Sequence, residues 1–181
     1  MNLTYSNQRA LKSCRNQRGF TLIEVLVSSL ILMIGLVGVA GLQAMSLKNN
    51  QSAYMRSQAS AFAYDLADRM RSNVAGAEAG FYDPDSATAH STCATAVGCS
   101  VQQLAQNDLA EWNGSLAANL PMGTGFVCID STPYDGSGLG DTQCDGTGTR
   151  HTVKLWWDDN RDGAISVTDA NTERLSITFQ L

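Results

Sequence analysis

The stretch RGFTLIEVLVSSLILMIGLVGVAGLQAMSL, residues 18–47, decides the fold of this chain. From Val25 to Leu47 there are 23 consecutive residues without a charge. At about 1.5 Å per residue, a helix of that length extends about 35 Å, which is enough to cross a bilayer core of about 30 Å. The stretch therefore predicts a membrane-spanning helix.

Charge is distributed unevenly on the two sides of this segment. Residues 1–19 hold four basic residues and no acid, whereas the remainder holds 8 basic and 17 acidic residues. The positive-inside rule then predicts residues 1–19 in the cytoplasm and everything after Lys48 on the far side. With 44% hydrophobic residues and a formal net charge of −5, the composition argues against a disordered chain and against a nucleic-acid-binding protein.

One residue does not fit a plain membrane anchor. Glu24 lies at the head of the apolar run, and a carboxylate inside a membrane costs about 2.5–3.5 kcal/mol even on mild insertion scales. The simple interpretation is an interfacial side chain that reaches toward lipid headgroups. The alternative is a carboxylate with a specific partner.

The residues around Glu24 favour the second interpretation. Arg18-Gly19 followed by Phe-Thr-Leu-Ile-Glu at 20–24 resembles the N-terminal signature of type IV pilin-like proteins. The resemblance implies that a prepilin peptidase cuts between Gly19 and Phe20 on the cytoplasmic side and that Phe20 is N-methylated. The apolar helix would then stay in the mature protein, whereas a signal peptidase acting near residues 40–45 would remove it.

The resemblance also implies a role for Glu24 and an organisation of the chain. The Glu24 carboxylate would neutralise the Phe20 amine of a neighbouring subunit in a filament core, where an unpaired charge is costly. The expected segments are a cleaved leader at 1–19, a transmembrane or filament-core helix at 20–47, an amphipathic continuation of that helix at 48–73, and an exported globular head at 74–181.

The helical pattern continues beyond Lys48. Five apolar residues recur at spacings of four, three, four and four, which is one face of an amphipathic helix. Asn73 and Gly76 are stop signals, so a single helix of about 80 Å is predicted from Phe20 to Asn73. The five residues are Met55, Ala59, Phe62, Leu66 and Met70.

The head is predicted to be α+β. Residues 74–99 are loop-like; Ser100 and Gln103 form a capping-box pattern that begins a second helix, which Pro121 ends. Strands are predicted at 125–130, 152–157 and 175–181 from their alternating patterns. The expected fold is pilin-like: a long N-terminal helix packed on an antiparallel sheet, with a second helix.

The cysteines predict disulfides. Cys14 falls in the leader, and Cys93, Cys99, Cys128 and Cys144 lie on the exported, oxidising side. Three pairings are possible; Cys93–Cys99 with Cys128–Cys144 is favoured because each closes a local loop. The spacings do not form paired CxxC knuckles and no histidine has a ligand spacing, so zinc is not expected.

A candidate calcium loop lies at 158–169, DDNRDGAISVTD. The pattern resembles an EF-hand loop, although it ends in Asp where Glu is usual and follows a strand pattern. The alternative is a hairpin turn rich in Asp, Asn and Gly that needs no ion. The ligands would be Asp158, Asn160, Asp162, the backbone of Ala164, Ser166 and Asp169. No other cofactor is expected.

Catalytic motifs do not stand out. His90 and His151 are isolated, with no Ser or Cys nucleophile convincingly beside them, and the sequence holds neither a P-loop nor a dinucleotide fingerprint. The three tryptophans, Trp112, Trp156 and Trp157, are interpreted as core or interface residues. The sequence is therefore not expected to be an enzyme.

The expected function is that of a minor pilin, incorporated at low copy and helping to initiate pilus assembly in a tip complex. Its partners would be the prepilin peptidase, other minor pilins, the major pilin, a tip adhesin and the inner membrane, with the head first periplasmic and then on the cell surface. Three alternatives remain: a minor pseudopilin of type II secretion, a DNA-uptake pilin and, from another class, a membrane-anchored periplasmic enzyme.

Overall fold

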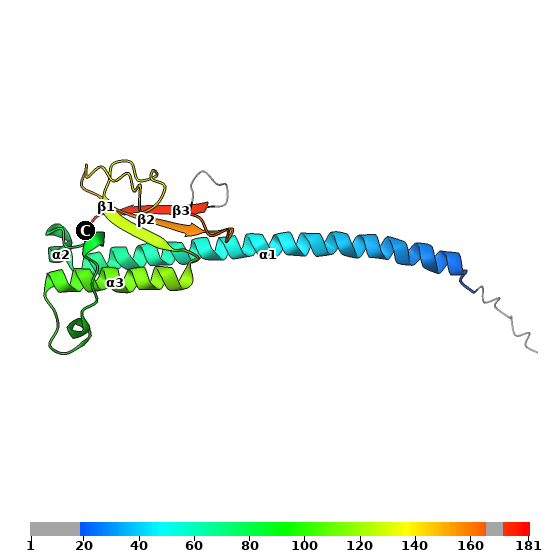
Figure 1. The fold of residues 1–181 in the computed structure, drawn as a ribbon, viewed down its shortest axis with the longest axis horizontal. Helices are drawn as coiled ribbons and strands as arrows, with labels where there is room; N and C mark the ends of the chain where they lie inside the picture. Colours follow the sequence, from blue (N-terminus) through cyan, green and yellow to red (C-terminus); the bar gives the residue numbers. More distant parts are fainter. Residues whose placement is uncertain (1–18, 166–171) are drawn as a thin grey trace, which may run out of the picture. The chain divides into compact units, whose positions relative to one another are not determined.

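The computed structural model describes residues 19–165 and 172–181. The chain divides into two compact units, residues 1–46 and 47–181. A single helix, α1 (Leu22–Ser72), belongs to both (Figure 1). The remaining elements are α2 (Val74–Glu78), the short 3-10 turns η1 (Pro84–Ser86) and η2 (Ser91–Ala94), α3 (Val101–Asn119), β1 (Thr124–Ile129), β2 (His151–Asp158) and β3 (Thr172–Phe179).

The first unit is the apolar part of α1. Every described residue up to Ser46 is exposed, and within the described part of the chain α1 is the one helix long and apolar enough to cross a membrane. The helix begins at Leu22, two residues later than the sequence predicts, because Thr21 caps it. The Thr21 carbonyl and hydroxyl accept the Glu24 N–H at 3.1 and 3.4 Å.

The second part of α1 buries one face in the head. Alanines at this face bring neighbouring elements close to the helix backbone, while the larger side chains fill the space between them. The helix ends where Asn73 turns away and donates from Nδ2 to the Val101 carbonyl at 2.8 Å. The buried residues are Met55, Ala59, Ala63, Leu66, Ala67 and Met70.

The prediction that residues 74–99 are loop-like is wrong for 74–78, which are helical, whereas 79–99 are irregular apart from two 3-10 turns. Directly after Asn73 the chain forms α2 over VAGAE, and the two 3-10 turns follow. Alanines at 75 and 77 favour a helix, and Gly76 permits the close approach to Asn73: a Cβ there would lie 2.5 Å from Asn73 Nδ2. The chain therefore becomes helical again at Val74, after an interruption at Asn73.

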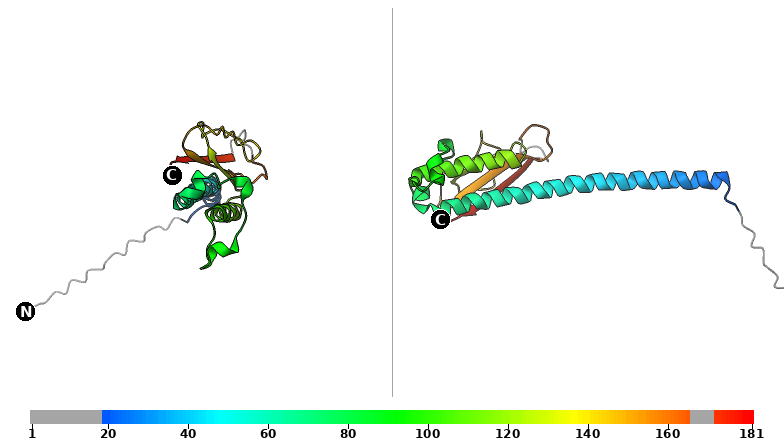
Figure 2. Two further views of the ribbon diagram at one scale, coloured as in Figure 1. Left: turned by 90° about the vertical axis from the view of Figure 1, so that its left-hand side faces the viewer. Right: turned by 90° about the horizontal axis from the view of Figure 1, so that it is seen from below.

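The predicted second helix, α3, begins as the capping box indicates. The Ser100 hydroxyl accepts the Gln103 N–H at 3.2 Å, and Gln103 Oε1 accepts the Ser100 N–H at 3.1 Å. In the head, α3 lies beside the second part of α1 (Figure 2). Trp112 joins the two helices, because its indole N–H donates to the Phe62 carbonyl at 2.9 Å.

The three strands form one antiparallel sheet in the order β1-β2-β3. β2 is central, and Val153, Leu155 and Trp157 point into the core shared with α1 and α3. The opposite face of β2 is buried as well: Lys154 and Trp156 are both 0% exposed. That face is covered by the long connection at 130–150 (Figure 1).

Strand boundaries differ slightly from the prediction. β1 starts one residue earlier, and β3 spans Thr172–Phe179 where 175–181 is predicted. The difference follows from pairing, since β3 aligns along all of β2, from His151 opposite Phe179 to Asp158 opposite Thr172. Register with the central strand, not local apolar alternation, sets the limits of an edge strand.

Candidate functional site

The predicted cleavage position lies ahead of α1. Gly19 and Phe20 are non-helical, and Phe20 is 82% exposed. Arg18 lies outside the described residues. A peptide bond in an exposed, non-helical segment has no intrahelical hydrogen bonds to lose when a peptidase binds it. The local structure therefore suits processing between these two residues.

Glu24 lies in the first turn of α1. A carboxylate there interacts favourably with the positive end of the helix dipole and with the unpaired N–H groups of the first turn. The side chain is exposed in the single chain, so it is available to a partner. The sequence places it four residues after Phe20, as the predicted amine-to-carboxylate contact requires.

A charged cluster, unforeseen from the sequence, joins α1 to α3. The Arg69 guanidinium lies 2.9 Å from Asp65 Oδ2, 3.2 Å from Asp108 Oδ1 and 3.0 Å from Glu111 Oε2. The Tyr82 hydroxyl donates to Asp108 Oδ2 at 2.6 Å. The hydrogen bond from Arg69, with a second from Asn107, lowers the pKa of Glu111. Only the Asp65–Arg69 spacing of four residues hinted at this cluster.

Electrostatics at Tyr82 indicate a structural role for the cluster. Burial, reinforced by the hydrogen bond to Asp108, raises the pKa of the Tyr82 hydroxyl far above its ordinary range. The hydroxyl therefore stays protonated at any physiological pH and remains a donor. The cluster fixes α3 and the segment after α2 against α1.

A second cluster missed by sequence reasoning lies on the outer face of the sheet. Lys154 Nζ lies 2.5 Å from Asp130 Oδ2 and 2.6 Å from Asp135 Oδ1, and it donates to the Thr142 carbonyl at 2.9 Å. The side chains of Lys154 and Asp130 are both 0% exposed. The hydrogen bond from Lys154, followed by that from Thr132, lowers the pKa of the Asp135 carboxyl. The connection from β1 to β2 thus folds around a buried ammonium group.

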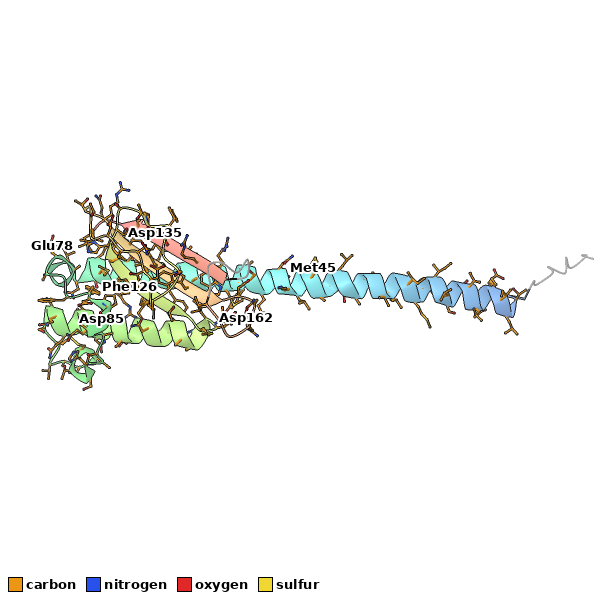
Figure 3. The ribbon with its side chains drawn as sticks, turned by 45° about the horizontal axis from the view of Figure 1, so that its top comes forward. Met45, Glu78, Asp85, Phe126, Asp135 and Asp162 are labelled. Atoms are coloured by element: carbon orange, nitrogen blue, oxygen red, sulfur yellow. A yellow bond between two sulfur atoms is a disulfide. The ribbon has the colours of Figure 1, made fainter. Side chains whose placement is uncertain are left out.

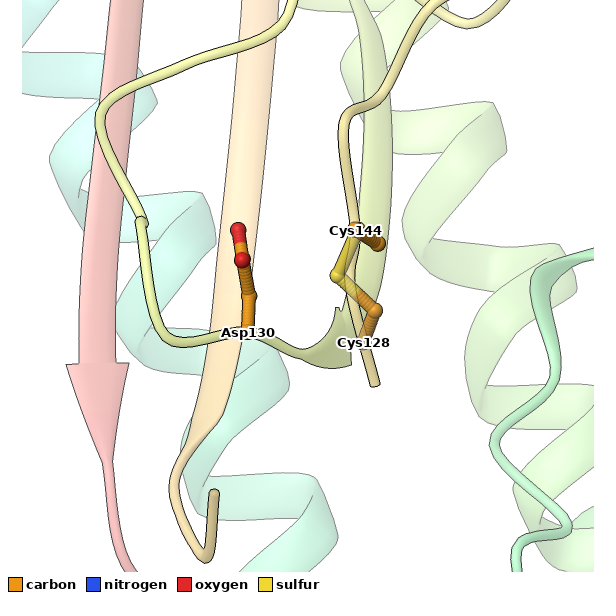
Figure 4. A group of neighbouring side chains, drawn as sticks. All are labelled: Cys128, Asp130 and Cys144. Atoms are coloured by element: carbon orange, nitrogen blue, oxygen red, sulfur yellow. A yellow bond between two sulfur atoms is a disulfide. The ribbon is translucent and has the colours of Figure 1, made fainter. Parts of the chain in front are cut away.

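The four cysteines of the head form two disulfides. Cys93 pairs with Cys99, and Cys128 pairs with Cys144, at Cα–Cα distances of 4.8 and 6.2 Å. This is the local pairing that the spacing favours. Cys128, Asp130 and Cys144 place ligand-type atoms within 4.8 Å of one another, but the two sulfurs are bonded to each other (Figure 4). They therefore supply no thiolate to a metal.

The predicted calcium loop at 158–169 is described only from 158 to 165. Asp158 ends β2, and its two carboxylate oxygens accept the N–H groups of Arg161 and Gly163 at 2.7 and 2.8 Å. Asp162 Oδ1 accepts the Ala164 N–H at 2.9 Å; Asp162 lies at the end of the head opposite Glu78 (Figure 3). Backbone donors thus order this part of the turn, and oxygen-rich side chains suit Ca²⁺.

The other predicted ligands of this loop, Ser166 and Asp169, lie outside the described residues. Calcium binding therefore stays a prediction.

The two histidines make local contacts. His90 Nε2 lies 2.9 Å from Gln106 Oε1, and the His151 ring stacks on Phe179 with centroids 5.8 Å apart. Burial lowers the pKa of His151. These contacts attach the histidines to α3 and β3, respectively.

Comparison with protein families places these features in context. Residues 14–40 match the prokaryotic N-terminal methylation motif, and residues 41–110 match the type IV pilin Tt1218 family. Together the two matches run without a gap from residue 14 to residue 110, more than half of the 181 residues. These two matches support a type IV pilin family for this chain. No curated protein and no solved structure matches it.

The architecture agrees with these family matches. A long apolar N-terminal helix with a three-stranded antiparallel sheet and further helices is the expected pilin-like α+β fold. Pilin domains are structural and not enzymatic, and the family implies processing by a prepilin peptidase and association with pilus components. The N-terminal motif and the apolar helix fit an inner-membrane-anchored pilin.

Proposed function

We propose that this pilin is a minor pilin that helps to initiate pilus assembly, and that it is cut between Gly19 and Phe20. The match to the methylation motif over residues 14–40 carries the cleavage part of the proposal, and the resemblance of α1 to a minor pilin supports the rest. Cleavage there leaves 20–47 as the membrane and later filament-core helix, 48–73 as its amphipathic continuation and 74–181 as the exported head. The N-methylated amine of Phe20 then becomes the mature terminus.

Glu24 directs assembly in this proposal. A mature subunit carries one positive amine and one negative carboxylate near the start of an otherwise uncharged helix. When the subunit moves from the bilayer into a fibre core, each of these charges lies in an apolar medium. An unpaired ion there costs several kcal/mol. Pairing Glu24 of one subunit with the Phe20 amine of the next neutralises both and fixes the axial register.

The sequence of α1 supports the low-copy, initiating role. The segments IGLVGVAGLQ and QASAFAYDLADRMRSN, at residues 34–43 and 58–73, resemble those of the minor pilin PilV, a pilus modification protein. We propose that the chain works with other minor pilins in a tip complex that primes polymerisation of the major pilin, with a tip adhesin as a further partner. The head would face the periplasm before incorporation and the cell exterior afterwards.

The nearest rival is a minor pseudopilin of type II secretion, since that class shares the cleavable apolar helix. A DNA-uptake pilin is a further alternative, which the acidic head disfavours. An anchored enzyme would not depend on Glu24. Deletion separates the first two classes: loss of surface pili supports the minor pilin, and loss of protein secretion with intact pili supports the pseudopilin.

The direct test is mass spectrometry of sheared surface fibres and of inner membranes, searching for a peptide that begins at methylated Phe20. Its presence in fibres supports a processed, exported pilin. Detection only in membranes would favour a pseudopilin or a primer that stays behind. If residues 1–19 remain attached in both fractions, the proposal is wrong.

A matched pair of variants tests the assembly contact. Glu24→Ala should abolish recovery of the protein in fibres while methylation of Phe20 continues, because the two steps use different groups. Glu78→Ala, an exposed acid in α2, should change neither. Normal incorporation of Glu24→Ala would exclude the charge-pairing role.

A further inference from the structure

A groove of about 360 Å³ opens at one end of the head. One side is formed by α1, through Gln51, Tyr54 and Met55, and another by residues 117–122 at the end of α3, with Arg161 also lining it. Tyr54 is 62% exposed and Met122 is 50% exposed. The groove therefore presents a surface of mixed character, in which apolar side chains lie beside the amides of Gln51 and Asn119 and the Arg161 guanidinium.

Backbone strain concentrates at this groove. Leu120 to Gly123 form a tight turn, in which Leu120 O accepts the Gly123 N–H at 2.9 Å. Pro121 occupies the second position, and the third, where glycine is normally favoured, holds Met122 at φ 50°. A left-handed methionine is uncommon and costs free energy that a glycine would avoid.

Arg161 repeats the pattern at φ 61°. Of the three non-glycine residues with positive φ in the described part of the chain, two line this groove. The two strained segments are joined, since the Asp158 N–H donates to the Pro121 carbonyl at 2.9 Å. Two residues that line one surface thus take a backbone conformation that costs free energy, and a contact with something outside the head is one way to offset that cost.

Helix geometry indicates what that contact is. Gln51 and Tyr54 follow the last residue of the uncharged run, Leu47, by four and seven positions, or about 6 and 10 Å along α1. Side chains on a helix lean toward its N-terminus, so Tyr54 reaches back toward the apolar run. The polar layer on each side of a bilayer is about 5–8 Å thick, and tyrosine is enriched in that layer.

We propose that this groove rests on the membrane surface and takes up the headgroup and glycerol region of a phospholipid while the protein is anchored in the inner membrane. The inference rests on the anchored topology of the proposed function. Tyr54 and Met122 insert at the boundary between headgroups and acyl chains, and Lys48 and Arg161 face lipid phosphates. Asp159 and Asp162, on the same turn as Arg161, oppose strong attraction to anionic lipid, so zwitterionic lipid suffices.

The test uses the full chain with Cys14→Ser in nanodiscs of phosphatidylcholine. An environment-sensitive fluorophore is placed on Ala118→Cys, an exposed residue that lines the groove, and lipids spin-labelled at the headgroup serve as quenchers. Quenching should be at least twofold stronger there than for the same fluorophore on Glu78→Cys at the opposite end of the head (Figure 3). Equal quenching at the two positions overturns the proposal.

Two further measurements distinguish lipid binding at the groove from a loss of folding and from a wrong membrane topology. Adding Met122→Gly to the Ala118→Cys protein should reduce quenching at least twofold without lowering the melting temperature, because glycine suits the left-handed backbone. A fluorophore on Leu36→Cys, read with spin labels deep in the acyl chains, reports the anchor itself. Quenching at 36 without preferential quenching at 118 excludes only the lipid-binding groove.

The remaining outcomes are equally decisive. Absence of quenching at 36 means that the anchored topology, and the proposed function with it, is wrong. Protection of position 118 from an aqueous quencher, without quenching by spin-labelled lipid, assigns the groove to another protein chain and overturns the lipid proposal.

Discussion

The buried ion pair on the outer face of the sheet makes a quantitative prediction. Lys154→Met keeps the length and apolar stem of the side chain but removes the ammonium that lies 2.5 Å from Asp130 Oδ2. Both side chains are 0% exposed, so the substitution leaves an uncompensated charge where water cannot reach it. Breaking a buried pair in this way costs about 3–5 kcal/mol. We therefore expect the free energy of unfolding to fall by about that amount.

The assay is guanidinium unfolding of the full chain in detergent, followed by the fluorescence of the tryptophans beside Lys154. Adding Asp130→Asn should recover at least about 1 kcal/mol, because the charge disappears while Oδ1 still accepts the Thr132 N–H, 3.1 Å away in the native protein. Arg150→Met, at an exposed cation, should change stability by less than about 0.5 kcal/mol. A loss below about 1 kcal/mol for Lys154→Met would refute the reasoning.

Three further predictions concern the head. Burial lowers the pKa of His151, so the unfolded chain binds a proton first and stability falls as pH drops below the ordinary value of about 6.5; His151→Gln should remove that part of the pH dependence in unfolding curves recorded from pH 7.5 to 5. Calorimetric titration of the protein with Ca²⁺ should give heat that Asp158→Asn and Asp162→Asn abolish, and no heat at millimolar ion would exclude the site. Replacing Cys128 and Cys144 together by serine should lower stability by about 3 kcal/mol, given their separation of 16 residues; an unchanged denaturation midpoint at an unchanged slope would contradict a stabilising role for that disulfide.

Local signals in the sequence predicted much of this fold. The apolar run, the spacing of Met55 to Met70 and the Ser100–Gln103 capping box each depend on neighbours within one or two helical turns. Such patterns determine the existence and type of an element before any tertiary contact forms. The expected α+β fold, the second helix and the three strands follow from them.

The interactions that assemble the head were not predictable in the same way. Lys154 meets Asp130 and Asp135 across 24 and 19 positions, and Arg69 meets Asp108 across 39. Nothing in a single sequence indicates which acid will approach a given cation after folding. In the sequence, Lys154 looks like a solvent-facing residue of a strand in which apolar and polar residues alternate. In the structure it is buried, because the connection between β1 and β2 covers that face of the sheet.

The N-terminal features differ in kind. Gly19, Phe20 and Glu24 are recognised in the sequence by their pattern. The predicted partner of the Glu24 carboxylate belongs to another subunit, so the structure of a single chain adds little to the prediction of that contact. Met122 is the opposite case: its type and position are unremarkable in the sequence, and only the left-handed backbone makes it a residue of interest.

Because α1 is one continuous helix that also forms part of the core of the head, it has a mechanical consequence. A pull applied at its N-terminal end is transmitted along the helix axis to the row of side chains from Met55 to Met70. The load is then shared in shear among many packed contacts, together with the hydrogen bond from Trp112 to the Phe62 carbonyl, and does not peel them apart one at a time. A filament subunit built in this way resists tension through the hydrophobic core of its head.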